Sequence, residues 1–224
     1  TEKVINKKIE VIETPYVKPS QSFDASLYEQ ELKSKKYVLF FGSIGLVKGV
    51  GTIAEIIFDL FEKNKDLHFV FVGKKVNNQI NNTPLWDHLI QKAGKHANRI
   101  IHFEALKHDK LFPIIQNAQC VVLPSLIDNF PNTCIEAMAN SKIVIGTVGN
   151  GFDQLIDSGK NGFLIDPNDH NQLLKKINKV LDLPVAEKEK IELAAKKRID
   201  KLDPDIVLKQ LVELYRTTIK NFKN

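Results

Sequence analysis

The chain has 224 residues, of which 43% are hydrophobic and 26% charged, so it can hold one large globular domain with an appendage. Its formal net charge of +5 permits an anionic partner but does not choose between a nucleotide, a nucleic acid and a membrane surface. The sequence has no run of about 18 apolar residues and its amino-terminal stretch does not resemble a secretory signal, so we expect a cytoplasmic protein without a transmembrane helix.

The first part of the chain predicts an appendage and then a buried strand. Within residues 1–20, the alternating segment from Lys8 to Ile12 predicts an edge strand that runs into an extended linker. Residues 22–36 are polar, with room for one short helix, and the apolar run YVLFF from Tyr37 to Phe41 predicts a buried strand. Glycines then space the turn from Gly42 to Gly49.

The middle of the chain alternates between helices and strands. Ile53, Ile56 and Leu60 recur at helical spacing and predict an amphipathic helix after the glycine turn. The elements expected next are a strand from Leu67 to Val72 that ends at Gly73, a polar loop from Asn77 to Thr83, a helix from Pro84 to Ala93, a strand from Arg99 to Phe103 and a helix from Asp109 to Ala118.

A strand–loop–helix–strand unit follows. It comprises a strand from Cys120 to Leu123, a loop from Leu126 to Pro131, a helix from Asn132 to Asn140 and a strand from Ile143 to Thr147. A ligand at this loop would meet the carboxyl end of a parallel strand and the amino end of a helix.

The remaining elements complete a layered fold. They are a short helix from Phe152 to Ser158, a strand from Phe163 to Ile165, a helix that ends near Leu181, and two closing helices, about Ala186 to Lys201 and Asp205 to Phe222. Strands that alternate with helices at this spacing predict an α/β fold, a parallel sheet with helices on both faces.

Two acids frame the loop of the central unit. Asp128 lies in the loop and Glu136 one turn into the helix, while Asn129, Asn132 and Thr133 are short polar residues able to cap the helix. The first N–H groups of a helix suit a phosphate, whereas carboxylates suit sugar hydroxyls. The pattern indicates a ligand with an anionic part and a polyol part; the alternative is a loop cap and a solvated helix residue.

The turn after the first strand matches neither common nucleotide motif. A P-loop is excluded because the residue five after Gly42 is Val47. A dinucleotide site is disfavoured because Lys74 and Lys75 follow the second strand, where an acid would hold the ribose. There remains Lys48, whose ammonium either reaches a diphosphate in the neighbouring crevice or faces solvent.

The cysteines and histidines do not suggest a metal site. Cys120 and Cys134 lie in the strand and helix of the central unit and predict buried, reduced thiols. The six histidines are scattered without a metal-ligating pair, so we expect no metal.

Several stretches in a fixed order resemble a known family. They are G-x-x-x-x-x-K-G from Gly42 to Gly49, the closing glycine Gly73, P-S-x-x-D-x-F-P-x-x-x-x-E-A-M-A from Pro124 to Ala139, then Gly151 and Asn161-Gly162. This order resembles the C-terminal, donor-binding domain of retaining GT-B glycosyltransferases (glycosyl transferases group 1, family 4). The resemblance implies a Rossmann-like domain at residues 21–203, the C-terminal half of a GT-B fold, that binds a nucleoside diphosphate sugar without a cofactor or metal.

The resemblance also implies a role for each matched residue. Lys48 would meet the donor diphosphate, Glu136 would bind the nucleotide ribose, and Asp128 would contact the transferred sugar; these three are the expected catalytic residues. The other expected donor contacts are Gly42, Ser43, Gly73, Leu106 beside the nucleobase, and the loop residues Asn129, Phe130, Pro131, Asn132 and Thr133 around the phosphates and sugar.

Some positions depart from the family pattern. Ser43 replaces an arginine of the cationic clamp, Asp128 is one methylene shorter than the commoner glutamate, and Pro131 replaces a glycine and cannot donate an N–H. Asn150 and Gln154 replace the first glycine and the acid of a later G-G-x-x-E motif. Such changes suit an unusual donor or a site that has drifted.

The function implied is the donor half of a retaining hexosyltransferase that acts on a polysaccharide or lipid-linked acceptor. Residues 1–20 would connect to an N-terminal acceptor domain that this sequence lacks, and the helix at 204–224 would pack toward that domain. We therefore expect weak donor binding and no turnover from this chain alone, and no nucleic-acid partner. The alternatives are a sugar-nucleotide epimerase of the same architecture and a non-catalytic nucleotide-binding module.

The sequence does not identify what one basic helix surface contacts. It comprises Lys188, Lys190, Lys196, Lys197 and Arg198. Such a surface suits anionic lipid at the inner face of the membrane, the missing domain, or solvent.

Overall fold

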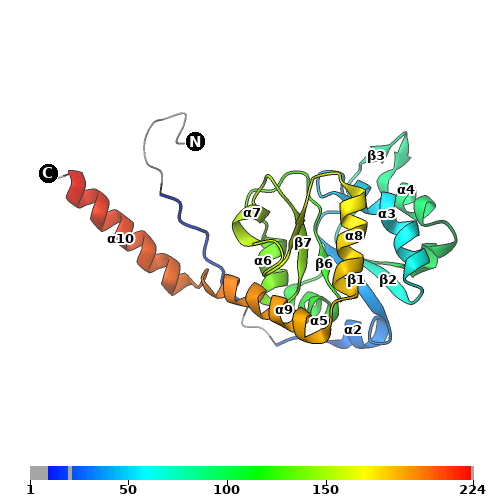
Figure 1. Cartoon of the computed structure of the whole chain (residues 1–224), viewed down its shortest axis with the longest axis horizontal. Helices are drawn as coiled ribbons and strands as arrows, with labels where there is room; N and C mark the ends of the chain where they lie inside the picture. Colours follow the sequence, from blue (N-terminus) through cyan, green and yellow to red (C-terminus); the bar gives the residue numbers. More distant parts are fainter. Residues whose placement is uncertain (1–9, 20–21, 223–224) are drawn as a thin grey trace.

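A parallel sheet with helices on both sides organises the molecule (Figure 1). The computed structural model describes residues 10–19 and 22–222. The sheet has six strands in the order β5-β2-β1-β6-β7-β8, and every neighbouring pair is parallel. Their bounds are β1 (Lys36–Phe41), β2 (Leu67–Val72), β5 (Ile100–Phe103), β6 (Val121–Val122), β7 (Val144–Thr147) and β8 (Phe163–Ile165). The predicted α/β, Rossmann-like fold is confirmed.

The two central strands show why the apolar runs form the core. β1 pairs with β2 along their whole length, from Lys36 opposite Leu67 to Phe41 opposite Val72. Every residue of β1 after Lys36 is buried. A strand covered by helices on both faces needs apolar side chains at every position, which is what an unbroken run such as YVLFF supplies.

Helices form a layer on each face of the sheet. On one face, α3 (Val50–Lys63) packs against α4 (Leu85–Ala93) and α8 (His170–Leu181). On the other, α6 (Asn132–Ala139) packs against α9 (Val185–Asp200), and α2 (Ser26–Glu31) against α5 (His108–Asn117). Among the described residues, the remaining helices are η1 (Gly94–Arg99), α7 (Phe152–Leu155) and α10 (Pro204–Phe222).

One expected loop contains a small hairpin instead. Over the stretch expected as a loop, β3 (Gln79–Ile80) pairs in antiparallel fashion with β4 (Thr83–Pro84), which ends one residue beyond it. Asn81 and Asn82 join them, with φ angles of 50° and 63°. Asparagine tolerates this left-handed region, and two such residues in succession make a tight hairpin turn. The prediction of a plain loop was wrong because strands of two residues carry no readable alternation.

The predicted edge strand is also wrong where it can be checked. Lys8 lies outside the described residues, and Glu10 to Ile12 form no strand. The segment 10–19 packs on helices instead: Tyr16 N–H donates to the carbonyl of Leu202 at 2.8 Å, and Arg198 bonds Glu13. This backbone hydrogen bond and the Glu13 contact anchor the segment without a neighbouring strand.

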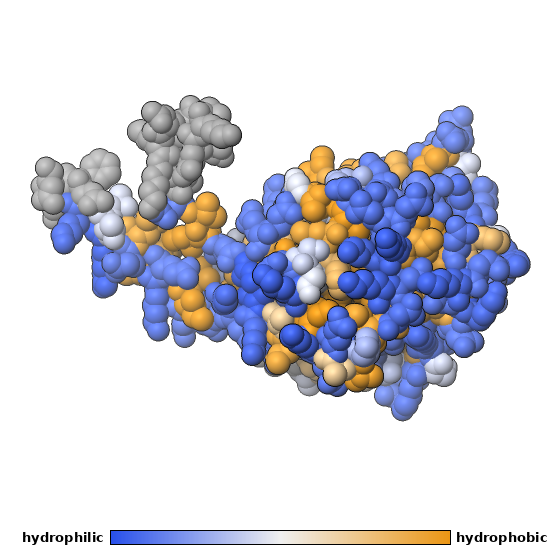
Figure 2. Space-filling model, in the orientation of Figure 1, coloured by the Kyte–Doolittle hydropathy of each residue, from blue (hydrophilic) through white to orange (hydrophobic). Residues whose placement is uncertain are grey.

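The last helix leaves the body of the molecule. α10 extends from the end of α9 beside the segment 10–19 (Figure 1), and apolar residues show on its exposed surface (Figure 2). The exposed large apolar residues of α10 are Ile206, Leu208, Val212, Tyr215 and Ile219, whereas Val207 at its start is buried. The helix expected at 204–224 is therefore present over its described part, and the rest of the described chain leaves its apolar stripe exposed.

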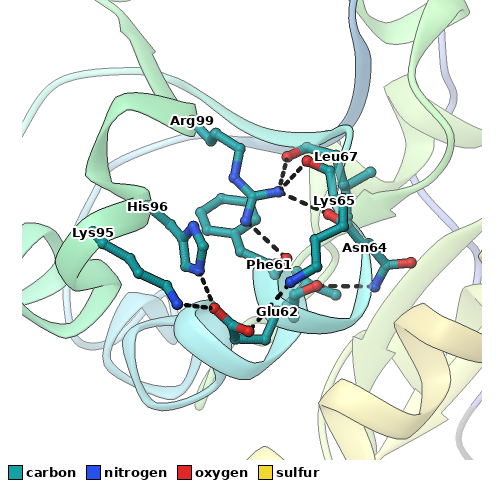
Figure 3. Close-up of polar contacts among 9 residues, drawn as sticks. Phe61, Glu62, Asn64, Lys65, Leu67, Lys95, His96 and Arg99 are labelled. Atoms are coloured by element: carbon teal, nitrogen blue, oxygen red, sulfur yellow. Dashed lines mark hydrogen bonds and ion pairs between the residues drawn. The ribbon is translucent and has the colours of Figure 1, made fainter.

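The edge of the sheet where the strands begin carries a dense polar cluster (Figure 3). Arg99 donates hydrogen bonds to the carbonyls of Phe61 and Asn64 at 2.8 Å and of Lys65 at 2.7 Å. Glu62 accepts from Lys95 at 2.7 Å and from His96 at 2.6 Å. Arg99 thereby satisfies carbonyls at the carboxyl end of α3, which have no partner inside the helix.

Two further predictions concern the thiols and the membrane. Cys120 and Cys134 are free and buried, as predicted, and burial raises the pKa of the Cys120 thiol to about 12. No helix in the described part of the chain combines the length and apolar character needed to cross a bilayer.

Candidate functional site

The order of the strands creates a crevice at one edge of the sheet. The chain moves from β1 to β2 and β5 on one side, then returns to β6 and continues to β7 and β8 on the other. β1 and β6 are therefore neighbours, with Leu39 opposite Val121, although they are far apart in the sequence. The loops that follow these two strands leave in opposite directions, and such a switch point is where open α/β sheets bind ligands.

A glycine lets the two loops touch. Gly49 ends the first loop with φ of 77°, and a Cβ placed there would lie 1.8 Å from the carbonyl oxygen of Pro124. Beside this contact, the N–H of Leu126 donates to the carbonyl of Val47 at 2.8 Å. Only glycine fits at this position, so Gly49 is a condition for the crevice rather than a ligand contact.

The loop after β6 is also held from its other side. A Cβ on Gly151 would lie 1.7 Å from the carbonyl oxygen of Asn129, and the N–H of Gly151 donates to the carbonyl of Asp128 at 2.8 Å. Thr147 donates its hydroxyl to the carbonyl of Ser125. Loop residues 125–129 are thereby fixed between two neighbours, which positions the Asp128 side chain.

Lys48 and Asp128 meet directly in the crevice. The Lys48 Nζ donates to the Asp128 Oδ2 at 2.6 Å, and their side chains are 37% and 15% exposed. The prediction that these residues converge is confirmed for this pair. An ammonium carries three protons, so the contact leaves Lys48 able to donate to an added anion.

The amino end of α6 opens toward the first loop. A Cβ on Gly42 would lie 3.7 Å from the Thr133 methyl group, so the first turn of α6 faces the glycine turn after β1. No side chain within the described residues caps α6, so the expected caps from Asn129, Asn132 and Thr133 do not form. The N–H groups of this turn consequently remain available to an anion.

The missing N–H of Pro131 affects the amino end of α6 less than the sequence suggests. It is the N-cap residue of α6, and its carbonyl accepts the first helical hydrogen bond, from Ile135. The N–H that proline lacks would precede the first turn. The amides of Asn132 and Thr133, which begin the helix, are unaffected.

A hollow of about 300 Å³ continues the crevice across β1, β2 and β5. Four predicted contact residues line it together: Gly42, Ser43, Gly73 and Leu106. A Cβ on Gly73 would lie 1.9 Å from the carbonyl oxygen of Gly42, so this glycine permits close packing of two strand ends. Lys74 also lines the hollow and places a second lysine near Ser43.

Glu136 has a partner that sequence reasoning missed. Its Oε1 lies 3.2 Å from Nε2 of His108, at the start of α5. Burial raises the pKa of Glu136, and the nearby His108 opposes that increase. His108 follows the third predicted strand and therefore lies at the carboxyl edge, but its spacing from the other histidines indicates no metal-ligating pair, so the sequence gives it no role.

Tyr16 is a second residue that the sequence did not reveal. Its hydroxyl is buried and has no hydrogen-bond partner among the described residues. Burial and the Glu136 charge raise the pKa of Tyr16 to about 12. A residue from the segment 10–19 thus lies close to the acid expected to bind ribose.

The predicted basic surface of α9 is only partly a surface. Arg198 bonds Glu13 and the carbonyl of Gln154, and Lys188 donates to Gln119. Lys190, Lys196 and Lys197 remain exposed. The prediction of one basic surface was wrong for Arg198 and Lys188, because the helix turns these two side chains toward the body of the protein.

Within the described residues, no three His, Cys, Asp or Glu side chains lie where they could share a metal ion. The absence of a metal from the reaction stays a prediction.

Solved structures share this fold. The C-terminal domain of a glycosyl transferase group 1 family protein from Francisella tularensis matches with a TM-score of 0.67 and 21% identity, over 80% of this chain and 92% of that domain. Anabaena Alr3699/HepE in complex with UDP and glucose matches with a TM-score of 0.69 and 20% identity, over 85% of this chain and 50% of that chain. At these identities the likeness shows the fold.

Sequence relatives lead to the family. The 2-deoxystreptamine N-acetyl-D-glucosaminyltransferase of Niallia circulans is 27% identical over 156 residues, which are 70% of this chain and 39% of that protein. The chain thus spans less than half of this relative. The sequence model of the family described as glycosyl transferases group 1 matches residues 26–198 of this chain. Because this match covers more than half of the chain, the chain belongs to the glycosyl transferases group 1 family.

Proposed function

We propose that the chain is the donor-binding half of a retaining glycosyltransferase that transfers a hexose-type sugar from a nucleoside diphosphate sugar to a polysaccharide or lipid-linked acceptor. The observation that carries the proposal is the contact between Lys48 and Asp128 beside the uncapped amino end of α6. A cation, helix amides and an acid are thereby gathered at one switch point, as a ligand with a diphosphate and a sugar requires.

Each part of the donor then has a chemically suitable neighbour. Lys48 and the first amides of α6 suit the diphosphate, and Asp128 suits the hydroxyls of the sugar. Glu136 suits the ribose, and the hollow beside Leu106 suits the nucleobase. The complex of Anabaena Alr3699/HepE with UDP and glucose supports a nucleotide sugar as the ligand class.

The same arrangement suits the chemistry of transfer. When the bond between the sugar and the diphosphate breaks, negative charge accumulates on the departing diphosphate. A fixed ammonium and fixed helix amides stabilise that charge without having to reorganise. Lys48 is therefore expected to act more strongly on the transition state than on the bound donor, because charge grows there.

The acceptor half is proposed to lie in the part of the protein that this chain does not contain. The chain spans 39% of the Niallia circulans relative, and no other described residue covers the apolar stripe of α10. We expect Leu208, Val212 and Tyr215 to pack on that part, and the isolated chain to bind donor weakly without turnover. The lysines that are exposed on α9 suit an anionic membrane surface, and a peripheral membrane contact there stays a prediction.

Calorimetry of the chain against UDP, GDP and ADP tests the proposal. We expect one of them to bind, and both Lys48→Ala and Glu136→Gln to weaken that binding by about 1.5–3 kcal/mol, the usual strength of hydrogen bonds to charged groups. Lys33→Ala is the control, because Lys33 lies in the exposed turn after α2 and pairs with Glu29. Equal binding by both site variants and the control would place the ligand elsewhere.

Product analysis with the full-length protein separates the main alternative. A transferase releases nucleoside diphosphate and forms a new glycoside. A sugar-nucleotide epimerase would change the free nucleotide sugar and release no nucleoside diphosphate.

A further inference from the structure

His108 and Glu136 reach each other from two helices on the same face of the sheet. The His108 Nε2 is 3.2 Å from the Glu136 Oε1, and the Glu136 side chain is only 16% exposed. We propose that His108 is a positioning residue for the nucleotide: it holds one carboxylate oxygen of Glu136 and leaves the other for the ribose hydroxyls. This inference rests on the proposed function and adds a residue that the sequence motifs do not include.

The chemistry of the contact fixes the direction of the hydrogen bond. An ionised carboxylate can only accept, so the His108 Nε2 must carry the proton. His108 comes two residues after Leu106, which lines the hollow, and it begins α5. It therefore links the wall of the proposed nucleobase hollow to the proposed ribose acid.

The imidazole is itself supported by a buried ring. The rings of His108 and Phe112, one turn apart in α5, have centroids 5.1 Å apart, and Phe112 is fully buried. Phe112 also contacts Phe23 edge to face at 5.8 Å. If His108 only packed on Phe112, any ring would serve in its place. To hold Glu136 it also needs its ring nitrogen, so the two roles can be told apart by substitution.

Few other titratable groups face Glu136. Tyr16 approaches it from the segment 10–19. From α9, Arg198 is engaged by Glu13, and Lys196 lines a hollow beside Ala139, nearly one turn beyond Glu136 in α6. Lys18, from the same segment as Tyr16, lines that hollow as well. His108 is the group in hydrogen-bond contact with the carboxylate.

The two other neighbours of α6 add no such contact. In α7, the Asp153 carboxylate accepts from the N–H of Gly149. The strand β7, from Val144 to Thr147, has no charged side chain.

The arrangement predicts a pH dependence of donor binding. Burial raises the pKa of Glu136 and His108 opposes this. A ribose hydroxyl donates best to the ionised acid, so binding should weaken as the pH falls through the pKa of Glu136. An imidazolium at His108 delays that loss to lower pH, because it stabilises the carboxylate.

Two variants separate the nitrogen from the ring. His108→Phe keeps a ring on Phe112 but removes the donor. In UDP, GDP and ADP titrations, we expect it to weaken the nucleotide that binds by about tenfold at neutral pH, the effect of one charged hydrogen bond. His108→Gln restores an N–H near the same place but cannot become charged, so it should regain most of the affinity at neutral pH. In both variants, nucleotide binding should begin to weaken at a higher pH than in the unsubstituted chain as the solution is acidified.

A matched control and a ligand-free measurement complete the test. His170→Phe changes the first residue of α8 in the same way, on the opposite face of the sheet, and should leave affinity and pH profile unchanged. NMR titration of the Glu136 carboxyl should show a higher pKa in His108→Phe than in the unsubstituted chain.

The failures of the inference and of the proposed function are distinguishable. Nucleotide binding that depends on Lys48 and Glu136 but keeps its affinity and pH profile in His108→Phe would overturn the inference alone. Absence of binding by the unsubstituted chain at every pH would overturn both.

Discussion

Two glutamates at opposite edges of the sheet meet opposite environments. Glu62, where the strands begin, accepts from Lys95, His96 and Lys65, which lower its pKa to about 2 (Figure 3). Glu136, where the strands end, is half-buried beside a single histidine, and its partial burial raises its pKa. The first acid is satisfied by the protein itself, whereas the second retains unused capacity to accept hydrogen bonds.

The cations at the two edges differ in the same way. The Arg99 guanidinium donates to carbonyls at the end of α3 and lies 4.2 Å from the Phe61 ring centroid. Lys48 makes one contact, with Asp128, and its side chain is 37% exposed. Charges that the fold fully satisfies stabilise it, and charges with unused donors or acceptors in a crevice are suited to a ligand.

The largest expected effect tests the structural edge. Arg99→Ala leaves several carbonyls without their charged donor and should lower the free energy of unfolding by about 3 kcal/mol. Urea denaturation measures this. Arg99→Lys keeps the charge but loses the planar fork that spans the carbonyls, so it should recover less than half of the loss. A stable Arg99→Ala variant would show that this edge does not support the fold as described.

The two glutamates should respond oppositely to substitution and to pH. The folded pKa of Glu62 lies below its ordinary value of 4.5, so its stabilisation is complete above that pH and is lost as the pH falls toward about 2. Glu62→Gln should therefore destabilise the chain at neutral pH and converge with the unsubstituted chain in acid.

Glu136→Gln should do the reverse, because the folded pKa of Glu136 is raised. Ionising this half-buried acid destabilises the fold as the pH rises through that pKa, so the glutamine variant should gain relative stability at neutral pH and none in acid. Thermal melts over a pH series measure both variants. Parallel pH profiles for the two would remove the contrast between the edges.

The smallest expected effect on stability lies in the crevice. Asp128→Asn removes a partly exposed pair and should change the free energy of unfolding by only about 0.5–1 kcal/mol. The same change frees Lys48, so a nucleoside diphosphate should bind equally or more tightly. The additional affinity contributed by the sugar should fall. Calorimetry with UDP and UDP-glucose separates these effects, and loss of both in equal measure would contradict the assignment of Asp128 to the sugar.

Local patterns were sufficient for much of the fold and part of the site. The strand from Leu67 to Val72 has the predicted bounds, because an unbroken apolar run that ends at glycine has one stable placement in a layered fold. Lys48 and Asp128 were found because each follows a recognisable buried strand. The order of those strands in the sheet then places them together.

The sequence by itself determined most of the segments that become the sheet strands and the long helices, since apolar periodicity and glycine positions act over a few residues. Only the tertiary structure decided that His108 meets Glu136, that Tyr16 lies near the same acid, and that Arg198 turns inward. His108 and Glu136 are 28 residues apart along the chain, and Arg198 and its partner Glu13 are 185 residues apart. Such contacts depend on how whole elements pack, and packing is a property of the assembled layers that no local pattern encodes.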